Sequence, residues 1–403
     1  MNANLCGNKE EFIKNLRHIN QRAEVDPDII DLLETFAGLR LERNKDVVFY
    51  DSDLIIKDKI LLDFISKNKN LDSRVLNFLA AYFLEMKSRG LYCLFNPAHL
   101  ANLLHTPLLQ LIHLATGKAN NYVRFFAAKR NGGVREILAP KPALKTVQRK
   151  ILDNLLHRVP LNAHAEGFRK QRSIVSNAQR HIDKKIVIKM DVKDFFPTIT
   201  YQRVLGLFKA LGYSHRVSLL LADLTTYKGK LPTGAPTSPA ISNIISRKMD
   251  KRFAKLGEKI GFDYSRYADD LAISSNNIKI IGMIPFFRQI MKEEGFEINE
   301  SKIRILRSGT KQSVTGIVVN KKPNIDRREI KKIRAVIHNC QHKEIKEEIE
   351  KWARMEKKHP APHKYSLREF RDSLLARINF IKMVNPVVGE KLLGQFNELP
   401  FRV

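Results

Sequence analysis

The feature that most constrains this chain is a pair of adjacent aspartates where a tight turn is expected. Tyr267-Ala268-Asp269-Asp270 lies between two short β-prone runs, residues 261–266 and 271–275, and this pattern predicts a β-hairpin with the aspartates at its tip. Two carboxylates a few Å apart repel each other by roughly 1–4 kcal/mol. We therefore expect positive charge at the turn, and a pair of divalent metal ions is the natural candidate.

The segments around the hairpin follow the order strand, helix, hairpin, helix, strand, which is the split β-α-β order of the ferredoxin-like class. The first strand opens with three β-branched residues, and Gly295 closes the second helix. In this topology the first strand lies beside the hairpin, so Asp191 is expected to approach Asp269. The strands and helices expected outside the hairpin cover residues 186–192, 239–255, 280–294 and 303–306.

Asp191 ends the first of these strands, where a carboxylate on a buried strand needs a positively charged partner. With Asp269 and Asp270 it would make a set of three carboxylates for two Mg²⁺ ions, which suits in-line phosphoryl transfer. For Asp191 alone, the simpler interpretation is a strand-end cap. The metal site is favoured because the loop at residues 231–239 contains Gly234, which permits close backbone approach, and leads into a helix start that suits a nucleotide.

The charge of the chain predicts a polyanionic partner. The chain has 71 Lys+Arg and 42 Asp+Glu, a formal net charge of +29, and such an excess is typical of proteins that bind nucleic acid or an anionic membrane. Residues 1–95 carry 14 basic and 15 acidic side chains, whereas residues 96–403 carry 57 and 27. The boundary near Asn96-Pro97 therefore separates a neutral N-terminal segment from a strongly basic remainder.

Other classes are disfavoured by the absence of their signals. The longest apolar stretch, residues 75–84, is too short to span a membrane and is expected to form a buried helix. The polar N-terminus argues against a signal peptide, and the three cysteines have no paired spacing for zinc or disulfides. We expect a cytoplasmic protein that binds nucleic acid and no membrane.

The first 95 residues show four helical patterns and no catalytic motif. Two interpretations are open, namely an extra helical layer packed on the main body and a docking surface for a second protein. The patterns cover residues 10–23, 29–41, 54–67 and 73–87.

The motifs resemble those of reverse transcriptases in order and spacing. The resemblance covers about residues 96–400 and rests on four stretches of the palm and two segments upstream of it. Residues 191–196, 233–239, 267–270, and 295–299 with Lys302 resemble the four palm motifs, residues 126–140 resemble the basic fingers segment, and residues 166–173 resemble the template-contacting motif.

Two shorter motifs resemble signatures of the retron branch of this family. Asn177-Ala178-Gln179-Arg180-His181 resembles the NAxxH signature, and Val314-Thr315-Gly316 resembles the VTG signature. Taken separately, the first is more often a polar helix face and the second a common strand end. Their joint occurrence around the palm motifs favours a retron reverse transcriptase.

The resemblance implies an α+β fold of the right-hand polymerase type. Residues 96–318 would form the fingers and a ferredoxin-like palm, and residues 319–403 a mostly helical, basic thumb. Residues 1–95 would be an added N-terminal helical extension.

The resemblance also assigns roles to single residues. Asp191, Asp269 and Asp270 would be the catalytic ligands of two Mg²⁺ ions, and Lys302 would supply a proton or charge to the leaving pyrophosphate. Phe196 would exclude a 2′-hydroxyl, with core packing as its alternative. Nucleotide binding is expected of Lys129, Arg135, Phe196, Thr233, Gly234 and Lys302, and RNA binding of Asn177, His181, Val314, Thr315, Gly316, Arg327, Arg328, Lys331 and Lys332.

One position departs from the family pattern. Reverse transcriptases often have glutamine just before the glycine of the second palm motif, where this chain has Thr233. The shorter side chain reaches less far toward the nascent base pair, which puts fidelity in question and leaves the metal chemistry untouched.

The activity implied by the resemblance is RNA-directed DNA synthesis by a bacterial retron. Such an enzyme would copy part of its structured non-coding RNA, using deoxynucleoside triphosphates, into single-stranded DNA as branched RNA–DNA (msDNA). A role in antiphage defence, with an effector protein as partner, is implied as well. The alternatives are a group II intron or diversity-generating reverse transcriptase and a catalytically silent RNA-binding scaffold.

Overall fold

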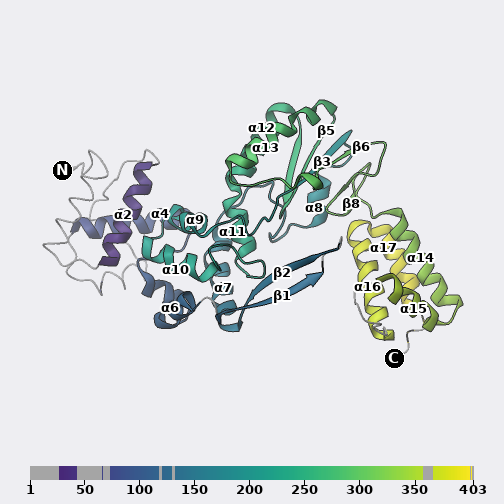
Figure 1. The fold of residues 1–403 in the computed structure, drawn as a ribbon, viewed down its shortest axis with the longest axis horizontal. Coiled ribbons are helices and arrows are strands. Elements are labelled where there is room, and N and C mark those ends of the chain that lie inside the picture. Colours follow the sequence, from purple (N-terminus) through teal and green to yellow (C-terminus); the bar gives the residue numbers. More distant parts are fainter. Residues whose placement is uncertain are drawn as a thin grey trace. The chain divides into compact units, whose positions relative to one another are not determined.

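The computed structural model describes residues 27–42, 66, 73–117, 120–128, 132–356, 366–399 and 401. The chain forms two compact units, each built from separate stretches of sequence (Figure 1). Unit 1 contains Met1–Leu161 and Asp194–Lys248, and unit 2 contains Asn162–Lys193 and Met249–Val403. The helices expected over residues 10–23 and 54–67 lie outside the described residues, apart from Ser66.

Unit 1 is mostly helical, with one two-stranded antiparallel sheet, β1–β2. Its helix α10 begins at His215 after Ser214, whose side chain accepts a hydrogen bond from the Val217 amide. Its elements are α2 (Pro27–Glu42), α4 (Ser73–Ser88), α5 (Pro97–Leu103), α6 (Leu108–Thr116), β1 (Tyr122–Ala128), β2 (Val134–Pro140), α7 (Pro142–Asn154), η2 (Leu156–Arg158), α9 (Tyr201–Leu211), α10 (His215–Thr225) and α11 (Ser238–Ile245).

The two described helices of the N-terminal segment pack onto the rest of unit 1. The Phe36 ring of α2 lies 5.3 Å from each of the Phe78 and Tyr82 rings of α4, and all three side chains are buried. On α10, the Arg216 guanidinium contacts Asp28 at 2.7 Å. These helices therefore form a layer on unit 1, and their role as a docking surface stays a hypothesis.

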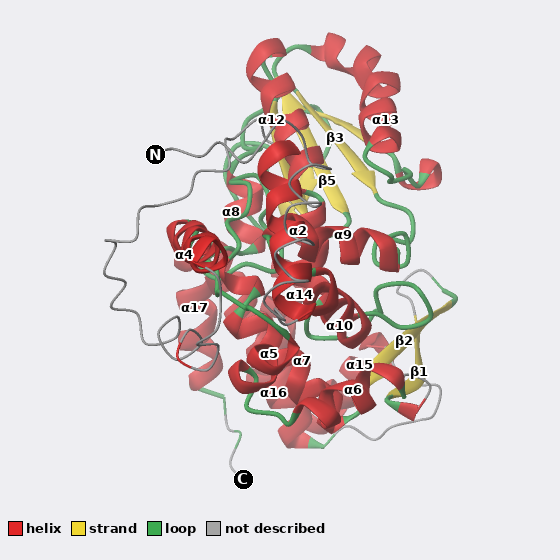
Figure 2. Cartoon of the chain, turned by 90° about the vertical axis from the view of Figure 1, so that its left-hand side faces the viewer, coloured by secondary structure: helices red, strands yellow, loops and turns green. Residues whose placement is uncertain are grey.

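The palm of unit 2 is a four-stranded antiparallel sheet with strand order β4-β5-β3-β6. This is the ferredoxin-like order that the sequence predicts. Figure 2 shows α12 and α13 beside this sheet. The strands are β3 (Ile186–Asp191), β4 (Asp263–Tyr267), β5 (Asp270–Ser275) and β6 (Arg304–Arg307), and the helices around them are α8 (Ile174–Gln179), α12 (Arg247–Ile260), η3 (Ile278–Met283), α13 (Ile284–Glu293) and η4 (Glu300–Lys302).

The two faces of the palm sheet have different partners because strand side chains alternate between faces. Tyr264 of β4 stacks on Phe253 of α12 with centroids 4.8 Å apart, and Phe253 lies 5.7 Å from Phe287 of α13. The next residue, Ser265, points to the opposite face and donates to Asn177 of α8. Aromatic packing therefore covers one face, and the other combines buried polar contacts with the apolar side chains of Val187 and Ala272.

The single helix predicted over residues 239–255 is wrong, because α11 and α12 are separated at Ser246. The Ser246 backbone has φ −76° and ψ −3°, close to a turn, yet its amide still donates to the Ser242 carbonyl at 3.0 Å. A break of one residue that keeps this hydrogen bond needs neither proline nor glycine, so the sequence carries no signal for it.

The C-terminal part of unit 2 is helical, and its buried apolar side chains form one cluster with Ala178, Val187 and Ala272 of the palm. Trp352 is fully buried there with Phe370, Leu374 and Ile378, and its ring lies 5.7 Å from Phe370. A short hairpin precedes the helices. The elements are β7 (Ser313–Val314), β8 (Ile317–Val318), α14 (Arg327–His342), α15 (Ile345–Glu356), α16 (Leu367–Val384) and α17 (Pro386–Asn397).

Candidate active site

The palm sheet brings together aspartates from distant parts of the sequence. Strands β3 and β5 are antiparallel neighbours, and Asp191 is the direct partner of Asp270. One residue further, the Val192 amide donates to the Asp269 carbonyl at 2.9 Å. The expected proximity of Asp191 to the hairpin tip therefore follows from the strand register.

The turn that presents the aspartates is a strained two-residue loop. Strand β4 ends at Tyr267 and β5 begins at Asp270, which leaves Ala268 and Asp269 as the loop. Ala268 has φ +59°, a left-handed conformation that costs a residue with a side chain on the order of 1 kcal/mol. The surrounding structure must hold this turn in place.

A lysine neutralises the first aspartate. The Lys302 ammonium lies 2.9 Å from each carboxylate oxygen of Asp191. Lys302 ends the short helix η4, and the preceding Asn299 amide donates to the Asp191 carbonyl at 2.8 Å. The fourth palm motif is thus fixed to the end of β3, which explains how a lysine so far along the chain reaches Asp191.

Negative charge accumulates at this end of the sheet. Burial raises the pKa of Asp270 above its usual value, and the charges of Asp269 and Asp191 raise it further. The ammonium groups of Lys189 and Lys302 oppose the rise. A carboxyl group whose pKa is raised in this way gains from any cation that approaches.

The donor set fits a divalent cation by its chemistry. Carboxylate oxygens are the ligands that Mg²⁺ prefers, and Asp191 already binds one cation, the Lys302 ammonium. Within the described ranges, no three His, Cys, Asp or Glu side chains are drawn together as a ready-made metal cluster. For Asp191 to bind a metal, the ammonium must move aside.

Three of the expected nucleotide-binding residues of unit 1, Arg135, Thr233 and Gly234, lie on or against β2. The Thr233 hydroxyl donates to the Glu136 carbonyl at 3.0 Å and accepts from the Leu138 amide at 3.1 Å. A Cβ on Gly234 would lie 2.8 Å from the Leu138 carbonyl oxygen, so only glycine allows this approach. Arg135 is exposed on the same strand, so the second palm motif contacts the strand that carries this arginine.

Two other residues expected to bind nucleotide are less informative. Lys129 lies outside the described residues. The Phe196 ring is half-buried and lies 5.6 Å from the buried Phe195 ring. Both interpretations of Phe196, sugar contact and core packing, remain predictions.

The two retron-like signatures meet inside unit 2. The Asn177 side-chain amide donates to the Thr315 hydroxyl at 3.4 Å, and that hydroxyl donates to the Ile174 carbonyl at 3.1 Å. Asn177, His181 and Val314 are at most 1% exposed. The expectation of RNA contact needs correction for these three side chains, because a buried group can shape a surface but cannot touch a ligand on it.

His181 is a neutral histidine within this polar network. Its Nδ1 lies 2.7 Å from the Ser274 hydroxyl and its Nε2 lies 2.7 Å from the Ser265 hydroxyl. Since Ser265 donates its proton to Asn177, Nε2 must carry the histidine proton and Nδ1 must accept from Ser274. Burial lowers the pKa of His181 from 6.5 to about 4, which keeps the ring neutral.

The basic residues expected to bind RNA on α14 differ in exposure. Arg327, Arg328 and Lys331 are exposed. Lys332 is half-buried, with its ammonium 5.4 Å from the centre of the Trp352 ring. Lys332 therefore stabilises the thumb packing through a cation–π contact, and its three neighbours present free charge to solvent.

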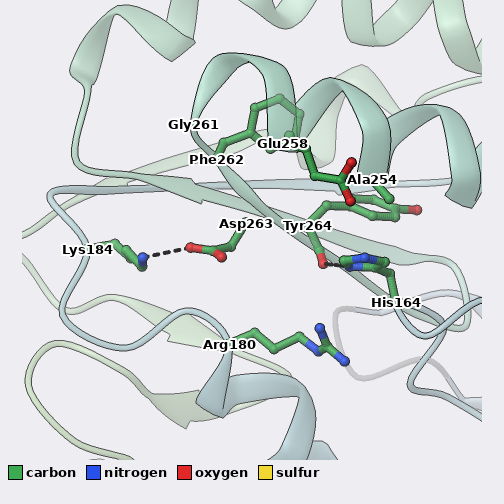
Figure 3. Close-up of a pocket in the computed structure, with 10 residues that line it drawn as sticks. His164, Arg180, Lys184, Ala254, Glu258, Gly261, Phe262, Asp263 and Tyr264 are labelled. Atoms are coloured by element: carbon green, nitrogen blue, oxygen red, sulfur yellow. Dashed lines mark hydrogen bonds and ion pairs between the residues drawn. The ribbon is translucent and has the colours of Figure 1, made fainter.

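A polar hollow of about 360 Å³ lies beside β4 and the end of α12 (Figure 3). Of its charged side chains, Lys184 pairs with Asp263 at 2.6 Å, Arg180 binds the buried Glu166 at 2.8 Å, and Glu258 is exposed. His164 Nδ1 lies 2.8 Å from the Tyr264 carbonyl. The lining contains none of Asp191, Asp269 and Asp270, so the hollow is separate from the candidate metal ligands.

Comparison with known proteins identifies the family. Residues 127–369 match the model of the family described as "Reverse transcriptase (RNA-dependent DNA polymerase)". This match covers more than half of the sequence and agrees with the palm topology. The chain therefore belongs to the reverse transcriptase family.

Curated relatives of the chain include retron reverse transcriptases. The chain is 36% identical over 300 residues to the retron Mx65 reverse transcriptase of Myxococcus xanthus, covering 70% of this chain and 65% of that protein. It is 34% identical to the retron Mx162 enzyme of the same organism, covering 71% and 62%. It is 34% identical to the retron Ec86 reverse transcriptase of Escherichia coli, covering 57% and 74%. The match thus spans just under two thirds of each Myxococcus protein.

One solved structure shows a slight likeness. Telomerase from Candida albicans in complex with a fragment of telomeric RNA aligns with 98% of this chain and 86% of that one, at 11% identity and a TM-score of 0.37. This likeness is too weak to bear on the fold. Among the described residues, no helix has the length and apolar character needed to cross a membrane.

Proposed function

We propose that this protein is the RNA-directed DNA polymerase of a retron, which copies part of a structured non-coding RNA into single-stranded DNA. The observation that carries the proposal is the register of β3 and β5, which places Asp191 opposite Asp270 at the hairpin tip. The retron relatives support the same assignment. By family resemblance, synthesis starts at a guanosine 2′-hydroxyl and leaves a branched RNA–DNA product, msDNA.

Asp191, Asp269 and Asp270 would hold two Mg²⁺ ions in this proposal. When bound, the ions would activate the attacking hydroxyl and stabilise the leaving pyrophosphate. The hydroxyl oxygen bonds to the α-phosphorus of the deoxynucleotide, the bond from this phosphorus to the bridging oxygen of pyrophosphate breaks, and the hydroxyl proton leaves to water. The aspartates fix where this exchange occurs.

Lys302 would change partners during the reaction. Without metal its ammonium neutralises Asp191. With Asp191 serving as a metal ligand, the Lys302 ammonium would be available to give charge or a proton to the departing pyrophosphate. Arg135 and Lys129 would contact the triphosphate through charge-assisted hydrogen bonds.

RNA binding would depend on charge and on surface shape. The exposed Arg327, Arg328 and Lys331 would contact phosphates, with Lys332 supporting the helix that carries them. The buried signature residues Asn177 and His181 would act indirectly, by fixing the surface around them. Selectivity would then come from RNA shape and unpaired regions.

Asp269→Ala tests the catalytic proposal. The variant should lose primer extension with Mg²⁺ and deoxynucleotides by on the order of 10³-fold or more, with RNA affinity nearly unchanged. Asp263→Ala is the matched control, because Asp263 begins the same hairpin and is paired with Lys184 at its surface. Retained DNA synthesis in Asp269→Ala would contradict the assignment.

Two alternatives have clear tests. If the protein were a catalytically silent RNA scaffold, the wild-type protein would not extend a primer. The presence of Asp191, Asp269 and Asp270 argues against a scaffold. A group II intron or diversity-generating enzyme would also extend a primer, so extension alone does not separate it from a retron enzyme. Separate RNase and DNase treatment of the nucleic acid that co-purifies shows whether a DNA strand remains joined to an RNA residue, which the retron proposal requires.

We further propose a role in antiphage defence with an effector protein as partner. The neutral charge of residues 1–95 favours contact with protein over contact with RNA there. Since Phe36 and Tyr82 are buried in unit 1, deletion of this segment would also disturb the core. Partner capture is therefore better compared between variants of its exposed side chains.

A further inference from the structure

A buried ion pair lies directly behind the aspartate turn. The Arg266 guanidinium makes two parallel bonds to Asp250 of α12, Nε to Oδ1 and Nη2 to Oδ2, each 2.8 Å. Both side chains are 0% exposed. The Tyr264 hydroxyl donates to Asp250 Oδ1 at 2.8 Å. The carboxylate thus accepts three hydrogen bonds, and the plane of the guanidinium is fixed.

The remaining terminal nitrogen of the guanidinium contacts the turn itself. Arg266 Nη1 donates to the Ala268 carbonyl at 3.0 Å. Ala268 is the residue with φ +59°, and its carbonyl precedes Asp269. One buried side chain therefore connects helix α12 to the strained peptide unit that orients the candidate metal ligands.

The backbone of Arg266 is held as firmly as its side chain. Its amide donates to the His164 carbonyl at 2.9 Å, and its carbonyl accepts from the Glu166 amide at 2.8 Å. Gly167 follows, and a Cβ there would lie 2.6 Å from the Ala268 nitrogen. The turn is thus contacted by the Arg266 guanidinium and by the backbone at Gly167.

Stability alone is a poor explanation for this ion pair. The desolvation of two buried charges offsets much of their attraction, so a well-packed apolar pair would often stabilise a fold as well or better. A planar guanidinium offers what an apolar pair cannot, namely five donors in a fixed geometry. Here two guanidinium nitrogens, Nε and Nη2, bind Asp250 of α12. The third nitrogen, Nη1, binds the Ala268 carbonyl of the turn.

We propose that Arg266 is a positioning residue, which Asp250 and Tyr264 orient so that its guanidinium holds the Ala268–Asp269 turn in the conformation needed for metal-dependent DNA synthesis. The inference rests on the proposed polymerase function. It concerns the placement of Asp269 and Asp270 and assigns Arg266 no contact with substrate.

Arg266→Lys tests this role. Lysine keeps the buried charge, but one ammonium cannot bond Asp250 twice and also reach the Ala268 carbonyl. We expect kcat for primer extension to fall about 10- to 100-fold, as for a misplacement near 1 Å. The Mg²⁺ concentration for half-maximal rate should rise several-fold, with RNA affinity unchanged. Amides of residues 267–271 should exchange hydrogen faster.

Arg252→Lys is the matched control. Arg252 lies on the same helix as Asp250 and also pairs with two carboxylates, Glu293 and Glu294, but at the surface. This variant should match wild type in kcat, Mg²⁺ dependence and hydrogen exchange at the turn. A purely structural role for Arg266 would lower the melting temperature and leave all three unchanged, which would overturn the proposal.

Tyr264→Phe covers the case in which Arg266→Lys does not fold. It removes one hydroxyl and keeps the ring stacked on Phe253. We expect a loss of kcat of about 3- to 10-fold, together with faster exchange at the turn. Normal kcat and normal exchange in this folded variant would refute the proposal.

The two levels of proposal fail separately. Absence of DNA synthesis by wild type would refute the polymerase function, and hydrogen exchange at residues 267–271 would still report whether Arg266 holds the turn. If wild type synthesises DNA and Arg266→Lys shows the same hydrogen exchange and Mg²⁺ dependence as wild type, only the positioning role is refuted.

Discussion

His181 illustrates how the palm uses buried polar side chains that are fully hydrogen-bonded. Its two ring nitrogens are hydrogen-bonded to the hydroxyls of Ser274 and Ser265, and the Ser265 hydroxyl donates its own hydrogen bond to Asn177. A protonated ring would have two donors, so Ser274 would have to give up its own donation to accept one. The network therefore selects neutral histidine.

Because the network requires neutral His181, the folded protein should lose stability as the pH falls. The pKa of His181 is about 4 in the folded protein against 6.5 ordinarily. Between these values the unfolded state binds the extra proton, so the free energy of unfolding falls as pH drops from about 6.5 to 4. The full effect is on the order of 3 kcal/mol. Urea unfolding of wild type and His181→Gln at pH 7.5 and 5 measures it.

His181→Gln should be less stable than wild type at pH 7.5 and should show a weaker loss on acidification. The exposed His338 supplies the control, since His338→Gln should follow the wild-type curve at both pH values. Equal acid sensitivity of His181→Gln and wild type would show that His181 does not carry this dependence.

Single residues differ in how far the sequence reveals them. Asp191, Asp269 and Asp270 were predictable because their motifs and the strand order around them are local patterns. Arg266 and Asp250 were missed, since an arginine beside a motif is ordinarily a solvent-exposed group. The available signal was alternation along β4, which puts Arg266 on the face of Tyr264 toward α12.

Among the elements, the palm was predictable and helix crossings were not. Strand runs and turn residues specify the hairpin and its neighbours directly, and the break at Asn385-Pro386 between α16 and α17 follows from proline. The closeness of α16 and α17 depends on tertiary packing. A Cβ on Gly389 would lie 2.1 Å from the Lys382 Cα, so these helices touch through their backbones.

Gly389→Ala should therefore destabilise the thumb. The helices must separate to admit a methyl group at that distance, at a cost of about 3 kcal/mol or more. Thermal or urea unfolding should show the loss. A Cβ on Gly394 of the same helix would meet nothing within 4 Å, so Gly394→Ala should be neutral or stabilise by up to about 1 kcal/mol. Equal effects of the two variants would contradict close packing at Gly389.

At the scale of the whole molecule, net charge predicts the class of partner but does not show which surface of the protein binds it. The net charge of +29 indicates a polyanion, but composition cannot separate cations that face solvent from those bound in the fold. Arg180 and Arg266, for example, bind buried carboxylates. The exposed cations at the start of α14 are different, because Arg327, Arg328 and Lys331 lie within the first five residues of the helix.

RNA affinity should therefore depend steeply on salt, and α14 should account for part of the slope. Each phosphate contact contributes about −0.7 to −0.9 to the slope of log K against log salt. Replacing Arg327, Arg328 and Lys331 with glutamine should reduce the slope by about 2 to 3. Binding of the structured RNA, titrated between about 50 and about 200 mM salt, measures this change.

A second triple variant separates local contact from total charge. Lys251, Lys255 and Lys259 are exposed on α12, and their replacement by glutamine lowers the net charge by the same amount. If α14 contacts RNA phosphates, the α12 variant should keep nearly the wild-type slope, because diffuse attraction between separated charges is screened within about 10 Å at 0.1 M salt. Equal slopes for the two triple variants would mean that charge acts through the whole field of the protein and would remove α14 from the RNA interface.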